Sequence, residues 1–322
     1  KPDPQLQNAS IAKPLTKSKN DKYTASDFGA GSKTEGSHYV GRFAPSPSGA
    51  LHYGSLITAL ASFLDARHNR GKWLLRIEDL DFFRNSENAS LEIQNQLKGF
   101  RLFWDEEVQF QSSKTVAYSK ALDQLAENTY LCSCSRKETS PVYRGTCRKN
   151  GADKTKSTAI RLKISAEKLS FEDAVFGLLD WKGSEELGDF IIRRKDGIFA
   201  YHLAVVVDDL NQKVSHVVRG SDLLDSTPRQ IDIYKKLGFS PPKYCHLPVI
   251  VDSAGFKLSK QNCAKRVDPK KAVTLIRCAL KDLGQIIPRT DNHQRILDEA
   301  IENWDIEKIP KKLKLVGPET II

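Results

Sequence analysis

Two segments that lie far apart in the chain carry side chains suited to binding nucleotide phosphates. The first, residues 42–55, reads Arg-Phe-Ala-Pro-Ser-Pro-Ser-Gly-Ala-Leu-His-Tyr-Gly-Ser. Its prolines and glycines stiffen a turn between a strand and a helix, so His52 stands at a helix N-terminus, where backbone N–H groups and the helix dipole favour anions. The imidazole can donate to phosphate oxygens, and Gly54 lets an adenine ring approach the backbone. Taken alone, the segment could also be an ordinary strand–helix turn with an exposed histidine.

The second segment, residues 256–262, reads Phe-Lys-Leu-Ser-Lys-Gln-Asn and follows an expected strand. Lys257 and Lys260 share one loop, where two positive charges can neutralise a departing pyrophosphate and stabilise a pentavalent phosphorus transition state. The alternative is a solvated basic loop. Since both segments occur in one chain and in this order, the sequence favours a nucleotide site over two unrelated loops.

Three cysteines fall close together, at Cys132, Cys134 and Cys147, whereas six cysteines in 322 residues are too few for a disulfide-stapled secreted domain. Three thiolates near a hairpin can make a tetrahedral zinc site if a fourth ligand is present. A redox-active Cys-x-Cys pair is the alternative. Such a cluster indicates a reducing compartment, and we expect a cytoplasmic protein.

The elements that must position these residues follow from hydrophobic patterning. Residues 39–44 and 73–77 predict two buried strands, residues 45–49 a loop, and the apolar residues from Leu56 to Leu64 a helix that stops at Gly71. Strand, loop, helix and strand make a βαβ unit, which implies a parallel sheet with ligands at its carboxyl edge. We therefore predict an α/β fold built on a Rossmann-type parallel sheet.

The rest of the chain supplies further elements of both kinds. The patterns predict helices near 86–99 and 115–127, a hairpin with arms 191–194 and 198–207, and strands at 214–218 and 244–251. Thr227 and Pro228 open a helix, as N-cap and first-turn proline, and Gly238 closes it. Residues 268–322 are expected to be mostly helical.

Composition narrows the function classes. No uninterrupted apolar run approaches the roughly 20 residues that a bilayer span needs, which excludes a membrane-spanning protein. Lys and Arg total 50 against 40 Asp and Glu, a net charge of +10 that favours a polyanionic partner such as nucleic acid. Residues 1–38 are too polar to order themselves and read as a flexible arm or an appended remnant.

The two phosphate-binding segments resemble the nucleotide-binding motifs of class I aminoacyl-tRNA synthetases, His-Tyr-Gly-Ser at 52–55 and Lys-Leu-Ser-Lys-Gln at 257–261. Other stretches resemble the glutamyl branch of that family, and the resemblance runs from about residue 39 to about residue 310. They are residues 41–49 (GRFAPSPSG), 76–81 (RIEDLD), 199–209 (FAYHLAVVVDD), 218–223 (VRGSDL) and 246–248 (HLP).

Residues 261–322 leave too little chain after the lysine motif for the helical anticodon-binding domains of a full glutamyl-tRNA synthetase. The sequence is therefore most similar to the truncated branch of the family, the glutamyl-queuosine tRNA(Asp) synthetases. That resemblance implies activation of L-glutamate by ATP without tRNA, followed by esterification of the queuosine at the wobble position of tRNA(Asp). One alternative is a minimal glutamyl-tRNA synthetase that charges the acceptor end. Another is an inactive tRNA-binding module, against which Arg42, Glu78, His52 and Lys260 argue.

The resemblance also implies site residues. An arginine can fork onto a carboxylate of glutamate, while Glu78 and Tyr201 can orient its α-ammonium. Without the resemblance, Arg219 and Glu78 would read as a sheet-edge ion pair and Tyr201 as a core residue. The implied glutamate pocket is Arg42, Phe43, Ala44, Pro45, Ser46, Glu78, Tyr201 and Arg219. The implied ATP site is His52, Gly54, Ser55, Ser259 and Lys260, with His52, Lys257 and Lys260 as the catalytic residues.

The resemblance also implies two metal ions and a division into domains. Magnesium is expected with ATP, and the phenolate of Tyr143 is implied as the fourth zinc ligand beside Cys132, Cys134 and Cys147. We expect a catalytic domain at 39–256 with a zinc-bearing insertion at about 130–150, then the lysine-motif loop and a small helical region at 257–322. We expect a monomer.

The lysine motif generates a first prediction. Replacing Lys260 by Ala should slow formation of the adenylate strongly, because a charge that neutralises the leaving pyrophosphate is removed, while glutamate binding stays nearly intact. Glutamate-dependent ATP–pyrophosphate exchange measures the first quantity and calorimetry the second. An unchanged adenylation rate would remove Lys260 from the catalytic set.

Overall fold

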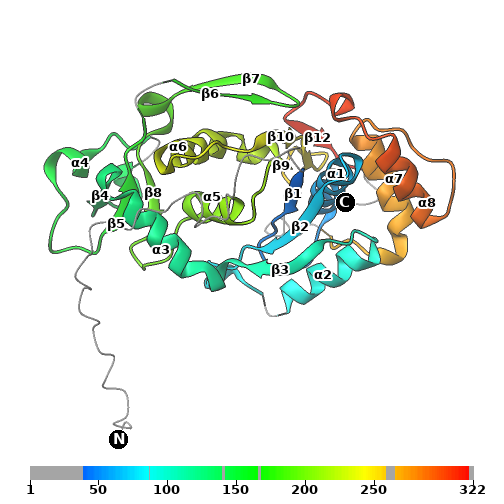
Figure 1. Cartoon of the computed structure of the whole chain (residues 1–322), viewed down its shortest axis with the longest axis horizontal. Helices are drawn as coiled ribbons and strands as arrows, with labels where there is room; N and C mark the ends of the chain where they lie inside the picture. The colour runs from blue at the N-terminus through cyan, green and yellow to red at the C-terminus, as the bar shows by residue number, and fades with distance from the viewer. Residues whose placement is uncertain (1–38, 87, 140–141, 166–167, 259–264, 319–322) are drawn as a thin grey trace, which may run out of the picture.

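A parallel sheet forms the centre of the computed structural model, which describes residues 39–86, 88–139, 142–165, 168–258 and 265–318 (Figure 1). Its strands are β1 (Val40–Phe43), β2 (Lys72–Ile77), β3 (Asp105–Phe110), β9 (His216–Gly220) and β10 (Lys243–Leu247). β1 pairs in parallel with β2, β2 with β3, and β9 with β10. The two groups meet where the Ser215 N–H donates to the Val40 carbonyl at 3.0 Å. The ladders run in the order β3-β2-β1 in one group and β9-β10 in the other, with β1 beside β9. This arrangement confirms the expected Rossmann-type parallel sheet.

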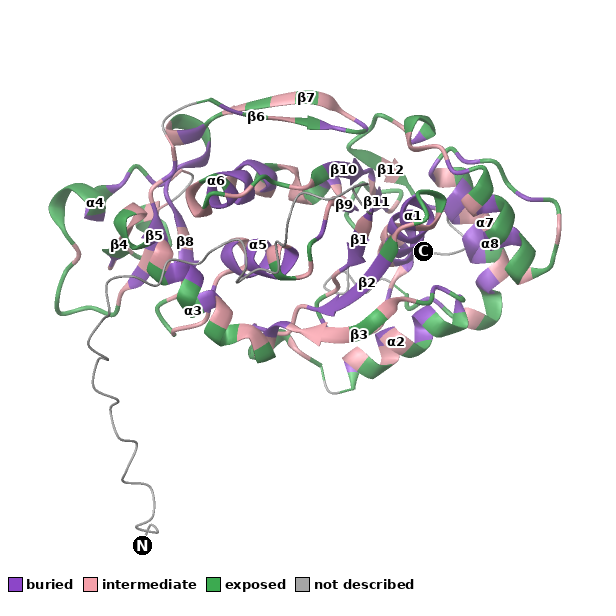
Figure 2. Ribbon diagram, viewed as in Figure 1, coloured by how far each residue is buried: buried purple, intermediate pink, exposed green. Residues whose placement is uncertain are grey.

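Helix α1 (Tyr53–His68) makes the crossover from β1 to β2 and is buried along most of its length (Figure 2). The helix ends at His68 with Asn69 as its C-cap, shortly before the expected stop at Gly71, where a Cβ would collide with the carbonyl of Tyr39. Helices α7 (Ala272–Asp282) and α8 (His293–Glu302) pack against α1 on the right of Figure 1. Trp304, just after α8, donates to Asp65 of α1 at 3.0 Å, so the C-terminal helices are fixed to the sheet layer.

A second apolar core lies beside the parallel sheet. Its residues come mainly from α3 (Thr115–Gln124), α5 (Tyr201–Asn211), α6 (Thr227–Leu237), β5 (Ala159–Leu162) and β8 (Phe190–Arg193). β4 (Thr129–Cys132) pairs with β5 at the border of this core. The strands form an antiparallel sheet in the order β4-β5-β8. Helix α2 (Ala89–Gly99) connects β2 to β3, and the short α4 (Thr146–Asn150) lies beside β4.

Two smaller strand pairs complete the fold. β6 (Lys168–Asp173) and β7 (Gly177–Lys182) form an antiparallel hairpin that runs along the top of Figure 1, and β6 joins β10 through the pair Asp173–Tyr244. β11 (Val249–Val251) pairs in parallel with β12 (Lys314–Val316). Of these four, only β11 lies in a segment that was predicted to be a strand. Within the described residues, no helix is long and apolar enough to cross a bilayer.

The predicted hairpin at 191–207 is correct only in its first arm and its turn. Gly197 turns with φ +85°, and Arg193 bridges Phe199. The second arm, however, is helix α5 and not a strand. The prediction was wrong because residues 203–209 are buried all round, and a continuous apolar run has no period that separates a buried helix from a buried strand.

Two other boundaries also differ from the sequence expectation. Residues 244–251 form two strands in different sheets, β10 and β11, because Pro248 has no N–H to continue a ladder. Helix α6 begins one residue early, so its N-cap is Ser226 and Thr227 is its first helical residue, while Gly238 caps it at φ +84° as expected. Residues 268–318 contain α7 and α8, but also strand β12.

Candidate active site

A cavity of about 290 Å³ lies at the carboxyl end of the parallel sheet, where the strand order reverses between β1 and β9. In an open α/β sheet this switch point is the ordinary place for a ligand, because the crossovers leave the sheet in opposite directions there. The lining residues are Arg42, Phe43, Ala44, Ser46, Thr58, Glu78, Tyr201, Val218, Arg219 and Leu223. Seven of the eight residues expected in the glutamate pocket therefore lie around one cavity. The eighth, Pro45, does not line the cavity, but its carbonyl accepts from the N–H of the lining residue Glu78 at 3.0 Å.

The buried side chain of Arg76, in β2, holds the acidic residues beside the cavity in place. Its guanidinium is 1% exposed and lies 2.8 Å from Asp209, 3.7 Å from Asp208 and 3.6 Å from Glu78. Arg42 reaches the same carboxylate of Asp209 at 3.4 Å. The sequence assigns no role to Arg76 and the two aspartates. In the structure, Arg76 contacts Glu78, and Asp209 contacts Arg42.

Glu78 is an acid whose charge is poorly stabilised. Burial raises the pKa of Glu78 to about 7, although Arg76 and Arg42 act in the opposite direction. A carboxyl group with this pKa changes charge near neutral pH, and a cation entering the cavity would stabilise its ionised form. Glu78 is therefore suited to receive an ammonium group.

Arg219 provides the cationic side. It is 3% exposed, its Nη2 donates to the hydroxyl of Thr227 at 2.7 Å, and its Nε donates to His246 at 3.1 Å. Nη1 lies 3.5 Å from the hydroxyl of Tyr201, another cavity residue. These hydrogen-bond partners are uncharged groups, so the guanidinium keeps its charge available for an anion in the cavity.

The His52 motif lies at the N-terminus of α1, as expected. His52 is the N-cap residue, its Nδ1 accepts from the Ser55 N–H at 3.3 Å, and its Nε2 lies 2.9 Å from the Ser55 hydroxyl. A Cβ at Gly54 would stand 3.3 Å from the His52 ring and 3.9 Å from Ile250. Gly54 thus allows the imidazole to fold back over the helix start.

The two segments expected to bind phosphates meet through β11. Ile250 of β11 neighbours Gly54, and its carbonyl accepts from the Leu258 N–H at 2.9 Å. Lys257, one residue earlier, forms an ion pair with Asp222 at 2.6 Å, close to the end of β9. Ser259 and Lys260 lie outside the described residues.

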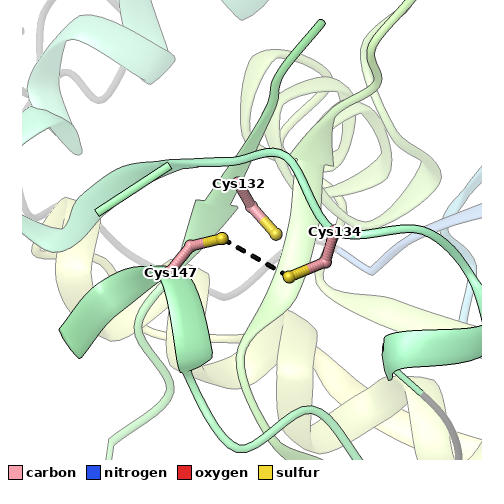
Figure 3. Close-up of side chains that lie close together, drawn as sticks. All are labelled: Cys132, Cys134 and Cys147. Atoms are coloured by element: carbon pink, nitrogen blue, oxygen red, sulfur yellow. Dashed lines mark hydrogen bonds between the residues drawn. The ribbon is translucent and has the colours of Figure 1, made fainter. Parts of the chain in front are cut away.

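The three clustered cysteines form a separate, partly buried group at β4 and α4 (Figure 3). Their sulfur atoms lie within 4.8 Å of one another and point toward a common centre, and those of Cys134 and Cys147 are 3.4 Å apart. The Tyr143 hydroxyl lies 3.5 Å from Cys132 and 3.6 Å from Cys134. The structure therefore brings together all four groups that the sequence pattern implied as ligands.

The donor set fits a soft divalent metal. Burial opposes ionisation of Cys147, but hydrogen bonds from the Ser133 backbone and from Tyr143 lower the pKa of Cys147 to about 6. Burial raises the pKa of Cys134 to about 11 and also raises the pKa of Tyr143. Three cysteine sulfurs and a phenol are a set that such an ion would deprotonate on binding, since zinc, for example, prefers thiolate ligands.

Sequence reasoning missed several residues of the cavity and its support. Thr58, Val218 and Leu223 line the cavity, and Thr227 and His246 hold Arg219. In the sequence, Thr227 marks only a helix start and His246 only begins the stretch HLP. A signal existed for His246, since it ends a buried strand next to β9, but the sequence does not say which neighbour it contacts.

Comparison with known proteins agrees with the geometry. The family model for the catalytic domain of class I tRNA synthetases of the E and Q type matches residues 39–274. A glutamyl-Q tRNA(Asp) synthetase from Photobacterium profundum is 41% identical over 295 residues, covering 89% of this chain and 95% of the relative. One from Vibrio vulnificus is 43% identical over 288 residues, covering 87% and 94%.

The fold is also found in a larger solved protein. A glutamate tRNA ligase from Elizabethkingia meningosepticum, crystallised with its amino acid, matches with a TM-score of 0.72 and 23% identity. The match covers 88% of this chain and 67% of that one. At this identity the likeness shows the shared fold.

The thiol cluster generates the second prediction. If the cluster holds the expected zinc ion, Cys132→Ser should abolish its binding and lower the free energy of unfolding by more than about 2 kcal/mol, because the energy of metal binding also stabilises the fold. Metal analysis of the purified protein and denaturant unfolding measure the two effects. Cys278→Ser, which changes a partly buried cysteine outside the cluster, is the control. A wild-type protein without metal, or a variant that keeps it, would contradict the zinc assignment.

Proposed function

The chain belongs to the class I glutamyl- and glutaminyl-tRNA synthetase family and, within it, to the glutamyl-Q tRNA(Asp) synthetases. On that premise we propose that it activates L-glutamate with ATP and transfers the glutamyl group to the queuosine at the wobble position of tRNA(Asp). The observation that supports this most directly is one cavity that holds two groups of opposite kind: Arg219, which forms no ion pair with a carboxylate among the described residues, and Glu78, a poorly ionised acid. Those two groups match an amino acid that carries an extra carboxylate. We further propose that it works in the cytoplasm, as an enzyme of tRNA and ATP.

In this proposal the cavity residues bind and orient glutamate. Arg219 receives a carboxylate through Nη1, and Glu78 and Tyr201 receive the α-ammonium. The turn at 42–46 closes the cavity with Arg42, Phe43, Ala44 and Ser46, while Pro45 holds the backbone of Glu78. A carboxylate and an ammonium fixed at opposite sides leave the reacting α-carboxylate oxygen directed toward the nucleotide site.

The chemistry needs no side-chain nucleophile. An oxygen of the α-carboxylate attacks the α-phosphorus of ATP, the bond to the bridging oxygen breaks, and pyrophosphate leaves. His52, Gly54 and Ser55 would hold the nucleotide at the N-terminus of α1, with Ser259 and Lys260 as further ATP ligands. The positive charges of Lys257 and Lys260 would neutralise the leaving group. ATP enters with magnesium as its counter-ion. A hydroxyl of queuosine then attacks the acyl carbon and AMP leaves.

We propose zinc as the ion held by Cys132, Cys134, Cys147 and Tyr143. Bound there, zinc would supply structural stability, because it joins β4 to α4 across a segment with little other buried apolar surface. Arg161 already packs over the Tyr143 ring at 4.0 Å, which keeps the phenol directed at the cysteines. The cluster lies apart from the cavity, so no step of the reaction passes through it.

The pKa of Glu78 generates the third prediction. Below about pH 7 the free enzyme carries a neutral Glu78, which binds an ammonium group poorly, so kcat/KM for glutamate in ATP–pyrophosphate exchange should rise between about pH 6 and about pH 8. Asp208 and Asp209 add negative charge nearby but are neutralised mainly by Arg76.

Glu78→Gln is the matched variant, because it keeps the shape and removes the titration. It should raise KM for glutamate about tenfold or more and abolish the rise with pH. A variant with the wild-type pH profile would show that Glu78 does not carry it.

The proposed substrate generates the fourth prediction. With labelled glutamate and ATP, label should appear on tRNA(Asp) that contains queuosine, and on neither tRNA(Asp) without queuosine nor tRNA(Glu). Nuclease mapping should place it in the anticodon loop. Label at the acceptor end of tRNA(Glu) would make this a minimal charging enzyme, and absence of glutamate-dependent exchange would make it a binding module.

A further inference from the structure

A buried chain of three side chains leads away from the cavity to a carboxylate that the proposed reaction does not use. Arg219 Nε lies 3.1 Å from His246 Nε2, and His246 Nδ1 lies 2.7 Å from Asp173 Oδ2. Asp173, His246 and Arg219 are 1%, 0% and 3% exposed. They come from the ends of β6, β10 and β9, so the sheet itself aligns them.

The chemistry of the donors fixes the protonation of this chain. A guanidinium nitrogen can only donate, so Nε2 of His246 must present its lone pair to Arg219. The proton of the neutral imidazole therefore sits on Nδ1, where it donates to Asp173. Burial lowers the pKa of His246, although Asp173 acts in the opposite direction, so the ring is neutral at working pH.

Two neighbouring side chains, Thr227 and Tyr244, keep Arg219 and His246 in these positions. The Thr227 hydroxyl accepts from Arg219 Nη2 at 2.7 Å and lies 3.1 Å from His246 Nε2. The ring of Tyr244 lies against both side chains, 5.3 Å from the guanidinium and 6.1 Å from the imidazole. Nε and Nη2 are thus occupied, and Nη1 is the group directed toward Tyr201 in the cavity.

We propose that Asp173 and His246 are positioning residues for glutamate: Asp173 fixes the Nδ1–H tautomer of His246, and His246 orients Arg219 so that Nη1 receives the carboxylate of the amino acid. This inference rests on the proposed function. It adds two residues that touch neither substrate and a definite tautomer. The arrangement is similar to sites in which a buried carboxylate sets the tautomer of a histidine that contacts a third group.

Asp173→Asn reverses the tautomer, and it also removes the acceptor of the His246 backbone N–H, which donates to Asp173 Oδ2 at 3.1 Å, so variants of His246 itself are needed beside it. Oδ1 of Asp173 accepts from the Val175 and Phe176 N–H groups at 3.0 Å each, which forces the amide oxygen of an asparagine to stay there. The NH₂ group then faces His246 Nδ1, which must accept. Nε2 becomes protonated and faces Arg219, donor against donor.

Two replacements of His246 distinguish the loss of its hydrogen-bond acceptor from the loss of its side-chain volume. His246→Gln places an amide oxygen within reach of Arg219, whereas His246→Leu fills space without an acceptor. Asp232→Asn, at a fully buried aspartate of α6 that pairs with Lys236, controls for general destabilisation. Steady-state ATP–pyrophosphate exchange with wild type and the four variants gives kcat and KM for glutamate and for ATP.

We expect Asp173→Asn and His246→Leu to raise KM for glutamate about tenfold or more, with KM for ATP within about twofold of wild type. His246→Gln should stay within about threefold. Equal KM values for glutamate in His246→Leu and wild type, or a parallel rise in both KM values, would overturn the proposal. A wild-type enzyme without glutamate-dependent exchange would instead overturn the proposed function, and the ligand named here with it.

A spectroscopic measurement tests the tautomer without any turnover. In the ¹⁵N-histidine NMR spectrum, the signal lost in His246→Gln belongs to His246. It should show a protonated Nδ1 in wild type and a protonated Nε2 in Asp173→Asn. A protonated Nε2 in wild type would overturn the proposed hydrogen-bond chain, and it would do so even if one of the variants failed to fold.

Discussion

The buried guanidinium of Arg76 is the constraint on which the site depends. It lies at the end of β2 among Asp208, Asp209 and Glu78, and it connects the sheet to α5. A buried ion cluster of this kind adds little net stability, because desolvation offsets the attraction, but removing one member leaves unpaired charge. Its value here is geometric. It joins α5, whose first residue is Tyr201, to the sheet and holds Glu78 at the carboxyl end of the sheet.

The two buried arginines next to the cavity have different roles because their partners differ in charge. Arg76 is surrounded by carboxylates and is neutralised inside the protein. Arg219 is held by a hydroxyl, a phenol and a neutral imidazole, which orient a guanidinium without neutralising it. A cation that is buried, oriented and not neutralised attracts an anionic ligand strongly, because the cavity has a low dielectric constant.

Sequence patterns predicted the parts of this protein that depend on neighbours along the chain. The βαβ unit from β1 to β2, helix α6 with its Gly238 cap and the approximate positions of α2 and α3 follow from local periodicity and capping residues. Helix α5 did not, because burial on every side removes the period. The cavity residues were found only through resemblance to a family. The contact of His246 with Arg219 and Asp173 joins three strands, and no local signal encodes which strands become neighbours.

Asp173 also shows why the fold and the site cannot be separated at this edge of the sheet. One of its oxygens caps the turn between β6 and β7, and the other faces His246. The hairpin therefore ends at a carboxylate whose position is set jointly by its own turn and by β10. A shift of the hairpin relative to β10 would move Oδ2 away from Nδ1 and free the imidazole that orients Arg219. The hairpin that runs along the outside of the molecule is in this way part of the frame of the cavity, although none of its residues lines it.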